Sequence, residues 1–146
     1  SIISDENYTY IPAKIISNSI KFSKNFITIN KGINQKINVE DGVISKIGVI
    51  GIINNNSDKF STVISILNTD LKINAKVKNT NHFGSLSWDA NNFQIMNLDD
   101  VPKSALIKNG DTIQTGGMSS IFPEDIPIGI ITDLVGGIYF IWIIKK

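Results

Sequence analysis

The sequence lacks most of the residues from which metal and redox sites are built. It contains no cysteine and a single histidine, His82, among its 146 residues. The absence of cysteine excludes disulfide bonds, thiolate metal ligands and cysteine nucleophiles. One histidine and dispersed acidic residues also offer no spacing that is typical of metal ligands. We therefore expect no metal site and no bound cofactor.

Long hydrophobic runs and blocks of like charge are also missing. The longest apolar stretch, Ile138–Ile144, is far shorter than the roughly 20 residues that span a bilayer as a helix, and it fits a buried strand better. Ser1–Asn7 is polar and shows no signal peptide. The formal net charge is +1, and the lysines are scattered along the chain, with only Lys145-Lys146 adjacent. This charge pattern predicts that neither nucleic acid nor an anionic membrane surface is a partner.

What the sequence does contain is enough apolar surface for a core and a succession of short strands. It is 42% hydrophobic and 18% charged, which is typical of one folded domain or two small ones. Turn signals separate β-favouring segments about every 8–12 residues, and no long helical pattern appears. This order predicts an all-β protein, and glycines at points of curvature favour barrels. The expected strands are Tyr8–Ser17, Phe26–Asn30, Val43–Ile44, Ile47–Ile53, Ser61–Leu67, Leu71–Val77, Ser85–Trp88, Phe93–Leu98, Asp111–Thr115, Ile128–Leu134 and Ile138–Ile144.

Two of these segments carry specific expectations. The proline in Tyr8–Ser17 cannot donate to a sheet ladder, so this segment should be an edge strand or a strand with a break. Leu71–Val77 alternates cleanly between apolar and polar residues, so that one of its faces should meet water. The residues expected on that wet face are Lys72, Asn74 and Lys76.

The stretch Val101–Ile131 contains the strongest turn signals of the chain. Asn109-Gly110-Asp111 offers residues that tolerate positive φ, so Ala105–Lys108 is expected to turn into Asp111–Thr115 in a hairpin-like joint. We expect a positive φ at the glycine of this turn, at Gly117, or at both.

The second half of that stretch should reverse the chain. Pro123 and Pro127 each fix φ and remove a backbone donor. Phe122 lies next to this constrained segment and is expected to fill one end of a barrel. Gly129, within a short apolar strand, indicates a β-bulge or a close backbone contact.

These residues resemble a bacterial family. Residues 110–129 contain GD, TGGM, IFP and IPIG in this order, where the MreC family of rod-shape-determining proteins typically has GD…TSGLGGIFPxGIPVG. Residues 26–53 contain FITINKG and two Gly-Val pairs, similar to the family's ITINKG…GVxxGMxV…GxVGxV. Order and spacing agree over most of the chain. The chain departs from the pattern at Gly116, Ser119 and Ser120, and at Glu124-Asp125, where the family often has a lysine or proline and a glycine.

The resemblance implies a fold of two small β-barrel-like subdomains side by side, with no long helix. Alternation stops and polar residues cluster near Val77–Asn81, so we expect the subdomains to comprise residues 8–77 and 78–146. The residues that carry the family pattern are expected to have structural roles. They are Gly32, Gly110, Asp111, Gly117, Phe122, Pro123 and Gly129.

The resemblance also implies a function. Members of the family are non-catalytic scaffolds of the rod-elongation machinery, which regulate cell shape by binding proteins of peptidoglycan synthesis. The implied partners of the full-length protein are the actin-like MreB, the membrane-embedded MreD and a class B penicillin-binding transpeptidase, and self-association stays open. The implied location is the periplasmic or extracytoplasmic face of the inner membrane, with an N-terminal membrane-spanning anchor that this chain does not contain.

The alternative is an enzyme that acts on the cell wall or a degenerate two-barrel serine protease. A protease would need a serine near His82, and Gly117–Ser120 does not reproduce the Gly-Asp-Ser-Gly loop of such enzymes. A glycosidase would need two carboxylates that face one sugar, whereas neighbours on turns usually point apart. Gly48–Gly51 does not match a nucleotide loop. We therefore expect no enzyme and no small-molecule substrate. The adjacent carboxylate pairs are Glu40-Asp41, Asp99-Asp100 and Glu124-Asp125.

Aromatic residues near the single histidine leave two interpretations open. Phe83, Trp88 and Phe93 lie close in sequence across an expected hairpin. In the first interpretation Trp88 and Phe93 fill the core of the second barrel. In the second, part of the hairpin lies at a protein interface, where aromatic side chains commonly supply the anchoring energy. The candidate partner-binding residues are His82, Phe83 and Trp88.

Overall fold

The computed structural model describes residues 3–4, 8–19, 23–46, 48–92, 94–102, 104–119, 121–135 and 138–143. Residues 3–4, 132–135 and 138–143 are described by their backbone alone. The described residues form strands and one short 3₁₀ helix. These elements are β1 (Ile3–Ser4), β2 (Thr9–Tyr10), β3 (Ile15–Ser19), β4 (Lys24–Ile29), η1 (Ile33–Gln35), β5 (Gly42–Ser45), β6 (Gly48–Asn56), β7 (Ser61–Asn68), β8 (Lys72–Val77), β9 (Phe83–Ser87), β10 (Ile95–Asp99), β11 (Thr112–Thr115), β12 (Pro127–Val135) and β13 (Ile138–Ile143).

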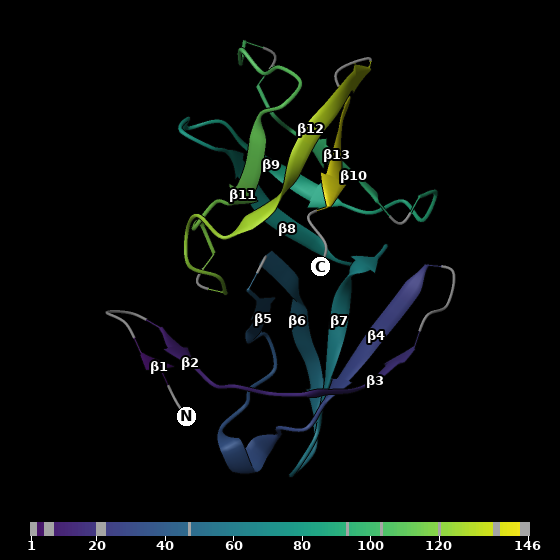
Figure 1. The fold of residues 1–146 in the computed structure, drawn as a ribbon, viewed down its shortest axis with the longest axis vertical. Coiled ribbons are helices and arrows are strands. Elements are labelled where there is room, and N and C mark those ends of the chain that lie inside the picture. Colours follow the sequence, from purple (N-terminus) through teal and green to yellow (C-terminus); the bar gives the residue numbers. More distant parts are fainter. Residues whose placement is uncertain are drawn as a thin grey trace.

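The strands are arranged as a closed barrel, an open sheet and a small N-terminal pair (Figure 1). The barrel has the order β10-β13-β12-β11-β8-β9, and the open sheet has the order β3-β4-β7-β6-β5. The barrel lies above the open sheet in Figure 1, and the β1-β2 pair lies beside β5. The predicted all-β class with two units and no long helix among the described residues is confirmed. The first unit is an open sheet, and only the second closes on itself.

The edge of the open sheet agrees with the sequence prediction for Tyr8–Ser17. This segment is split into β2 and β3, and the break between them contains Pro12. β3 is the edge strand, hydrogen-bonded to β4, and all of its residues are exposed. The next strand, β4, alternates between buried and more exposed residues because one of its faces packs on the sheet's core.

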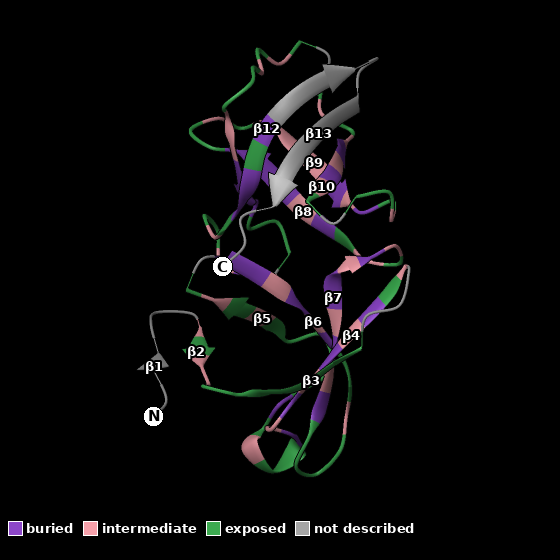
Figure 2. Ribbon diagram, turned by 45° about the vertical axis from the view of Figure 1, so that its right-hand side comes forward, coloured by how far each residue is buried: buried purple, intermediate pink, exposed green. Residues whose placement is uncertain are grey.

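The two sheets share part of their hydrophobic core. Figure 2 shows that buried residues lie in strands of both sheets. One cluster lies within the open sheet and includes Ile27, Ile53 and Val63. The larger cluster fills the barrel, and Val49 and Ile66 from the open sheet join it. Apolar burial therefore holds the two units together at their interface.

The boundary between the two units differs from the predicted one. The predicted boundary after Val77 assigned β8 to the first subdomain, but β8 pairs with β9 and β11 of the barrel. Residues 69–71 connect β7 of the open sheet to β8 of the barrel, and we place the boundary there. Alternation along β8 showed that it is a strand, but it could not show which strands it pairs with.

The predicted joint between Ala105–Lys108 and β11 is only partly correct. The turn exists: the Asp111 amide donates to the Lys108 carbonyl at 3.2 Å, and Gly110 has φ +93°. However, β11 pairs with β8 and β12, and not with Ala105–Lys108. The turn is held instead by β12, because the Gly110 amide donates to the Ile131 carbonyl at 2.8 Å.

Irregular pairing in β12 agrees with the prediction of a bulge near Gly129. Gly129 pairs with Ile113, whereas the next pair along joins Pro127 to Gln114, so one residue of β12 is left over. A bulge of this kind bends a strand and increases its twist. It lies immediately after the chain reversal that contains Pro123 and Pro127.

Candidate functional site

A shallow groove with a volume of about 360 Å³ lies on the outer surface of the barrel beside β8 and β9. Leu86 and Trp88 face the barrel core. Side chains alternate between the two faces of a strand, so Phe83, at an odd-numbered position, faces outward. Phe83 is half-buried, and Met118, which closes the groove from a loop, is 70% exposed. We call this feature the Phe83 groove. Its lining residues are Lys72, Ile73, Asn74, Phe83, Gly84, Ser85, Asp100 and Met118.

The polar atoms of the Phe83 groove are few, and its charges balance. Lys72 and Asp100 are exposed and supply one charge of each sign. Asn74 Nδ2 lies 3.6 Å from the Met118 sulfur, which is a weak contact. Asn74 Oδ1 is buried and has no hydrogen-bond partner among the described residues. The groove can therefore bind an apolar surface with a small polar component, and its charge favours neither sign.

Of the three predicted partner-binding residues, one lines the groove, one lies in a turn outside it and one is buried in the core. Phe83 lines the groove. His82 is half-buried in the turn before β9, where its carbonyl accepts from the Val77 amide at 3.0 Å, and it does not line the groove. Trp88 is 3% exposed and its Nε1–H donates to the Asn92 carbonyl at 2.7 Å. Trp88 is thus a core residue, and its place among the candidate contacts is corrected. Phe93 lies outside the described residues.

Met118 belongs to the loop between β11 and β12, residues 116–126, of which 116–119 and 121–126 are described and whose two ends are joined by Thr115. Thr115 is 1% exposed, and its hydroxyl donates to the Pro123 carbonyl at 2.6 Å and accepts from the Ile126 amide at 2.9 Å. The backbones of Thr115 and Ile126 are also hydrogen-bonded, at 2.9 Å. Gly117 has φ +73°, a conformation that residues with a Cβ rarely adopt. One buried hydroxyl therefore closes the loop that carries Met118.

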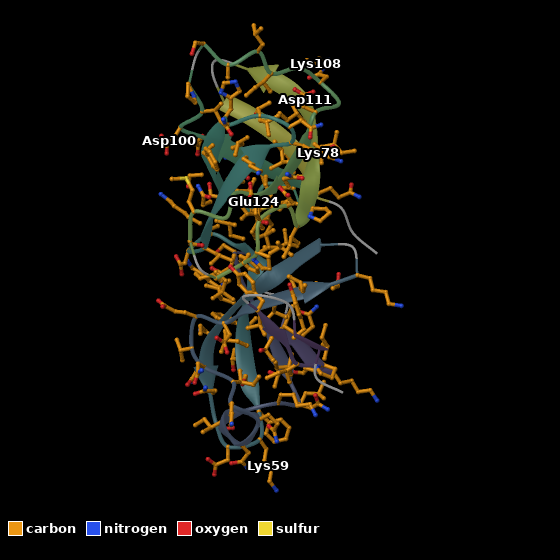
Figure 3. The ribbon with its side chains drawn as sticks, turned by 90° about the vertical axis from the view of Figure 1, so that its left-hand side faces the viewer. Lys59, Lys78, Asp100, Lys108, Asp111 and Glu124 are labelled. Atoms are coloured by element: carbon orange, nitrogen blue, oxygen red, sulfur yellow. The ribbon has the colours of Figure 1, made fainter. Side chains whose placement is uncertain are left out.

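The environment of Lys76 differs from the one that its place in the sequence predicts. Lys76 was expected in water, but only 8% of its surface is exposed. Its ammonium group is hydrogen-bonded to Glu124 and lies 3.1 Å from Asp125 Oδ1. Gln114 Nε2 donates to the same Asp125 oxygen at 2.6 Å. β8 does turn Lys76 away from the barrel core, but the 116–126 loop covers that face, with Glu124 on the outside of the barrel (Figure 3).

The ion pair raises the pKa of Lys76. The hydrogen bond from Lys76 to Glu124 is the largest cause, and the contact with Asp125 acts in the same direction. Burial of the ammonium group opposes both effects but does not outweigh them. Glu124 and Asp125 remain more than half exposed, so the pair consists of a covered cation and two solvated carboxylates.

Phe122, from the same loop, lies at the interface between the barrel and the open sheet. It is 4% exposed and packs against Gly42 of β5. Its carbonyl accepts a hydrogen bond from the Tyr8 hydroxyl at 3.1 Å, which ties the N-terminal segment to the loop. A groove of about 430 Å³ beside this contact is lined by Tyr8, Tyr10, Val39, Gly42, Ile44, Ile121 and Pro123, among others.

The acidic pairs considered for catalysis lie in turns or at the end of a strand, since Asp99 ends β10. Asp41 Oδ2 accepts from the Asn38 amide at 2.8 Å, and Asp100 has φ +65°. Gly32 also serves a turn, since its amide donates to Gln35 Oε1 at 2.8 Å across η1. Among the described residues, no three His, Asp or Glu side chains are grouped to hold a metal ion. No helix within the described ranges has the length and hydropathy needed to cross a membrane.

Comparison with known proteins identifies similar sequences. A family model described as rod shape-determining protein MreC, barrel core, matches residues 15–137. The chain is 29% identical over 147 residues to the cell shape-determining protein MreC of Geobacillus stearothermophilus, and equally to that of Bacillus subtilis strain 168. Each alignment covers 93% of this chain and 50% of the relative. The chain therefore spans about half the length of these relatives.

Solved structures share the fold. MreC from Pseudomonas aeruginosa has a TM-score of 0.81 at 20% identity, over 90% of this chain and 88% of that chain. The major periplasmic domain of the cell shape-determining filament MreC, in its monoclinic form, has a TM-score of 0.78 at 21% identity, over 92% and 88%. A complex between penicillin-binding protein PBP2 and MreC from Helicobacter pylori has a TM-score of 0.64 at 18% identity, over 83% and 76%.

Proposed function

Because the chain belongs to the MreC family of rod shape-determining proteins, we propose that it is the extracytoplasmic β part of a non-catalytic scaffold. This scaffold regulates cell shape by binding proteins of peptidoglycan synthesis. The names of the relatives, cell shape-determining proteins, support the role, and the periplasmic domain among the similar structures supports the location. MreB and MreD would contact parts of the full-length protein outside this chain, which spans only about half the length of its relatives.

The partner that we propose for this chain is a penicillin-binding transpeptidase, and its site is the Phe83 groove. A structure of similar fold is a complex between such a protein and MreC, which supports the class of partner. The exposure of Met118 beside Phe83 supports the site, because a 70% exposed methionine contributes little to the barrel core. A scaffold that recruits an enzyme without covalent chemistry needs an apolar patch whose desolvation supplies affinity.

A titration of the chain with the purified penicillin-binding protein tests this proposal. Phe83→Ala and Met118→Ala should each weaken binding by about 5- to 30-fold, because they remove apolar contact from the groove. Leu106→Ala is the matched control, since Leu106 is 96% exposed and does not line the groove. It should leave the affinity unchanged.

Two further measurements complete the test. Circular dichroism should show that all three variants are folded. Affinity should depend only slightly on salt, because the exposed charges of the groove, Lys72 and Asp100, balance. Unchanged affinity for folded Phe83→Ala would move the site elsewhere, and steep weakening with salt would contradict an apolar contact. Turnover of peptidoglycan by the chain would contradict the scaffold.

A further inference from the structure

We propose that Lys76 is a positioning residue: by holding Glu124 and Asp125 it fixes the 116–126 loop, which couples the Phe83 groove to the interface between the two units. The link to partner binding rests on the proposed function. The link between Lys76, the loop and the interface does not, and it has its own readout.

Lys76 is suited to hold the loop because its own strand is firmly paired on both sides. In the sheet register Lys76 is opposite Phe83 of β9 and opposite Gln114 of β11. Residues directly opposite one another in an antiparallel sheet point to the same face. The Lys76 side chain therefore starts from the same face as Phe83 and reaches the last part of the loop, where Glu124 and Asp125 bind it.

Glu124 lies against Gly117, the residue that precedes Met118. A Cβ atom built on Gly117 would lie 3.0 Å from the Cβ of Glu124, so the two limbs of the loop are in contact at this point. Met118 follows Gly117 directly and closes the groove. Gly116, one residue earlier, packs between Asn74 and the Phe83 ring. A shift of Glu124 would thus move the backbone that presents Met118.

The middle of the loop contacts the open sheet and the N-terminal segment. Phe122 lies two residues before Glu124, packs against Gly42 and accepts the hydrogen bond from Tyr8. Thr115 fixes the base of the loop through Pro123 and Ile126. Since Thr115 fixes the base of the loop and Lys76 fixes the limb that contains Glu124 and Asp125, a change at Lys76 should reach Phe122 and Met118 together.

Methionine methyl resonances provide a direct readout in the chain alone. The chain has two methionines: Met118 in the loop and Met96, which is 1% exposed in the barrel core. With ¹³C-methyl methionine, Lys76→Leu and Glu124→Gln should each shift the Met118 signal and leave the Met96 signal in place. Lys76→Leu should fold, because the carboxylates that it leaves behind are more than half exposed. Glu124→Gln should fold, because Lys76 keeps Asp125 as a partner at 3.1 Å. Lys78→Leu, which removes an exposed lysine just beyond β8, should shift neither signal.

Coupling to the interface is tested with Tyr8→Phe, which removes the hydroxyl that donates to Phe122. This change should shift the Met118 signal in the parent chain, and the shift should fall by at least half when Lys76→Leu is also present. Lys76→Leu should also weaken binding of the penicillin-binding protein by about fivefold or more. A Met118 signal unmoved by both Lys76→Leu and Glu124→Gln would overturn the proposal.

The two proposals fail in different ways. If the parent chain does not bind the penicillin-binding protein, the proposed function is wrong, while the methyl shifts still decide whether Lys76 fixes the loop. If Phe83→Ala weakens binding but Lys76→Leu does not, the groove stands and Lys76 does not position it. A Tyr8→Phe shift that is equally large with and without Lys76 would overturn the coupling to the interface.

Discussion

The Phe122 ring occupies the space that any side chain at Gly42 would need: a Cβ atom built on Gly42 would lie 2.7 Å from Cε1 of Phe122. Gly42 begins β5 of the open sheet, whereas Phe122 belongs to a loop of the barrel. Val49 and Ile66 of the open sheet join the same core cluster as Phe122. The interface between the two units is therefore closely packed, and substitutions on either side of it should lower the stability of the whole chain.

Phe122→Ala should lower the free energy of unfolding by about 3 to 5 kcal/mol, because it removes a buried aromatic ring and leaves a cavity at the interface. Denaturant titration followed by circular dichroism measures this change. Leu106→Ala, at a 96% exposed position, is the control and should have little effect. A loss below about 1 kcal/mol for Phe122→Ala would show that the ring contributes little to the fold.

Gly42→Ala should destabilise the chain by about 1 to 3 kcal/mol, because the added methyl group collides with the Phe122 ring. The same substitution in a Phe122→Leu background should cost less, since it removes the collision with the ring and leaves only the one with the Ile121 carbonyl oxygen, 2.8 Å from the added Cβ. A double-mutant cycle measures the difference. Strictly additive effects would contradict a direct contact between these two positions.

Gly117→Val should destabilise the chain by more than about 1 kcal/mol, because valine rarely adopts a positive φ. Gly110→Val should also destabilise it, but by less. Both glycines have positive φ, yet a Cβ at Gly117 would meet Glu124 whereas a Cβ at Gly110 would lie in open space. Thermal melts of the two variants measure this order. If both variants melt like the parent, the backbone conformation at these turns is not required.

The free energy of unfolding should fall at high pH, because the Lys76 ammonium group loses its proton. The pKa of Lys76 is raised above its ordinary value of 10.5 in the folded chain, so the ion pair contributes its full stabilisation below pH 10.5. That contribution is lost as the pH rises through the folded pKa, because the neutral amine no longer attracts Glu124 and Asp125.

Chemical denaturation at pH 9 and at pH 11 to 12 tests this effect by comparing the parent with Lys76→Leu and Lys78→Leu. The parent and Lys78→Leu should lose more stability over this interval than Lys76→Leu. Since other lysines and the tyrosines also titrate there, the difference between variants is the informative quantity. Equal losses in all three proteins would contradict the role of the Lys76 ion pair.

Much of the fold follows from local chemistry and could be predicted from the residues alone. Alternation along β8, the proline break between β2 and β3, and the positive φ of Gly110 and Gly117 each depend on a residue and its close neighbours. The motifs around residues 26–53 and 110–129 also indicated the family, which the match over residues 15–137 shows.

Which strands pair, and which segments cover them, depends on contacts between residues that are far apart in the sequence. β8 was predicted as a strand, but its place in the barrel depends on β9 and β11. Trp88 could face the core or a partner until the barrel closed around it, and Met118 gave no signal other than a methionine between glycines and serines. Lys76 shows the reason most clearly. Its strand position turned it outward as predicted, but a loop 48 residues away covers it and supplies both of its carboxylate partners. Periodicity defines the face of a strand on which a side chain lies, whereas burial also depends on distant segments that fold over that face.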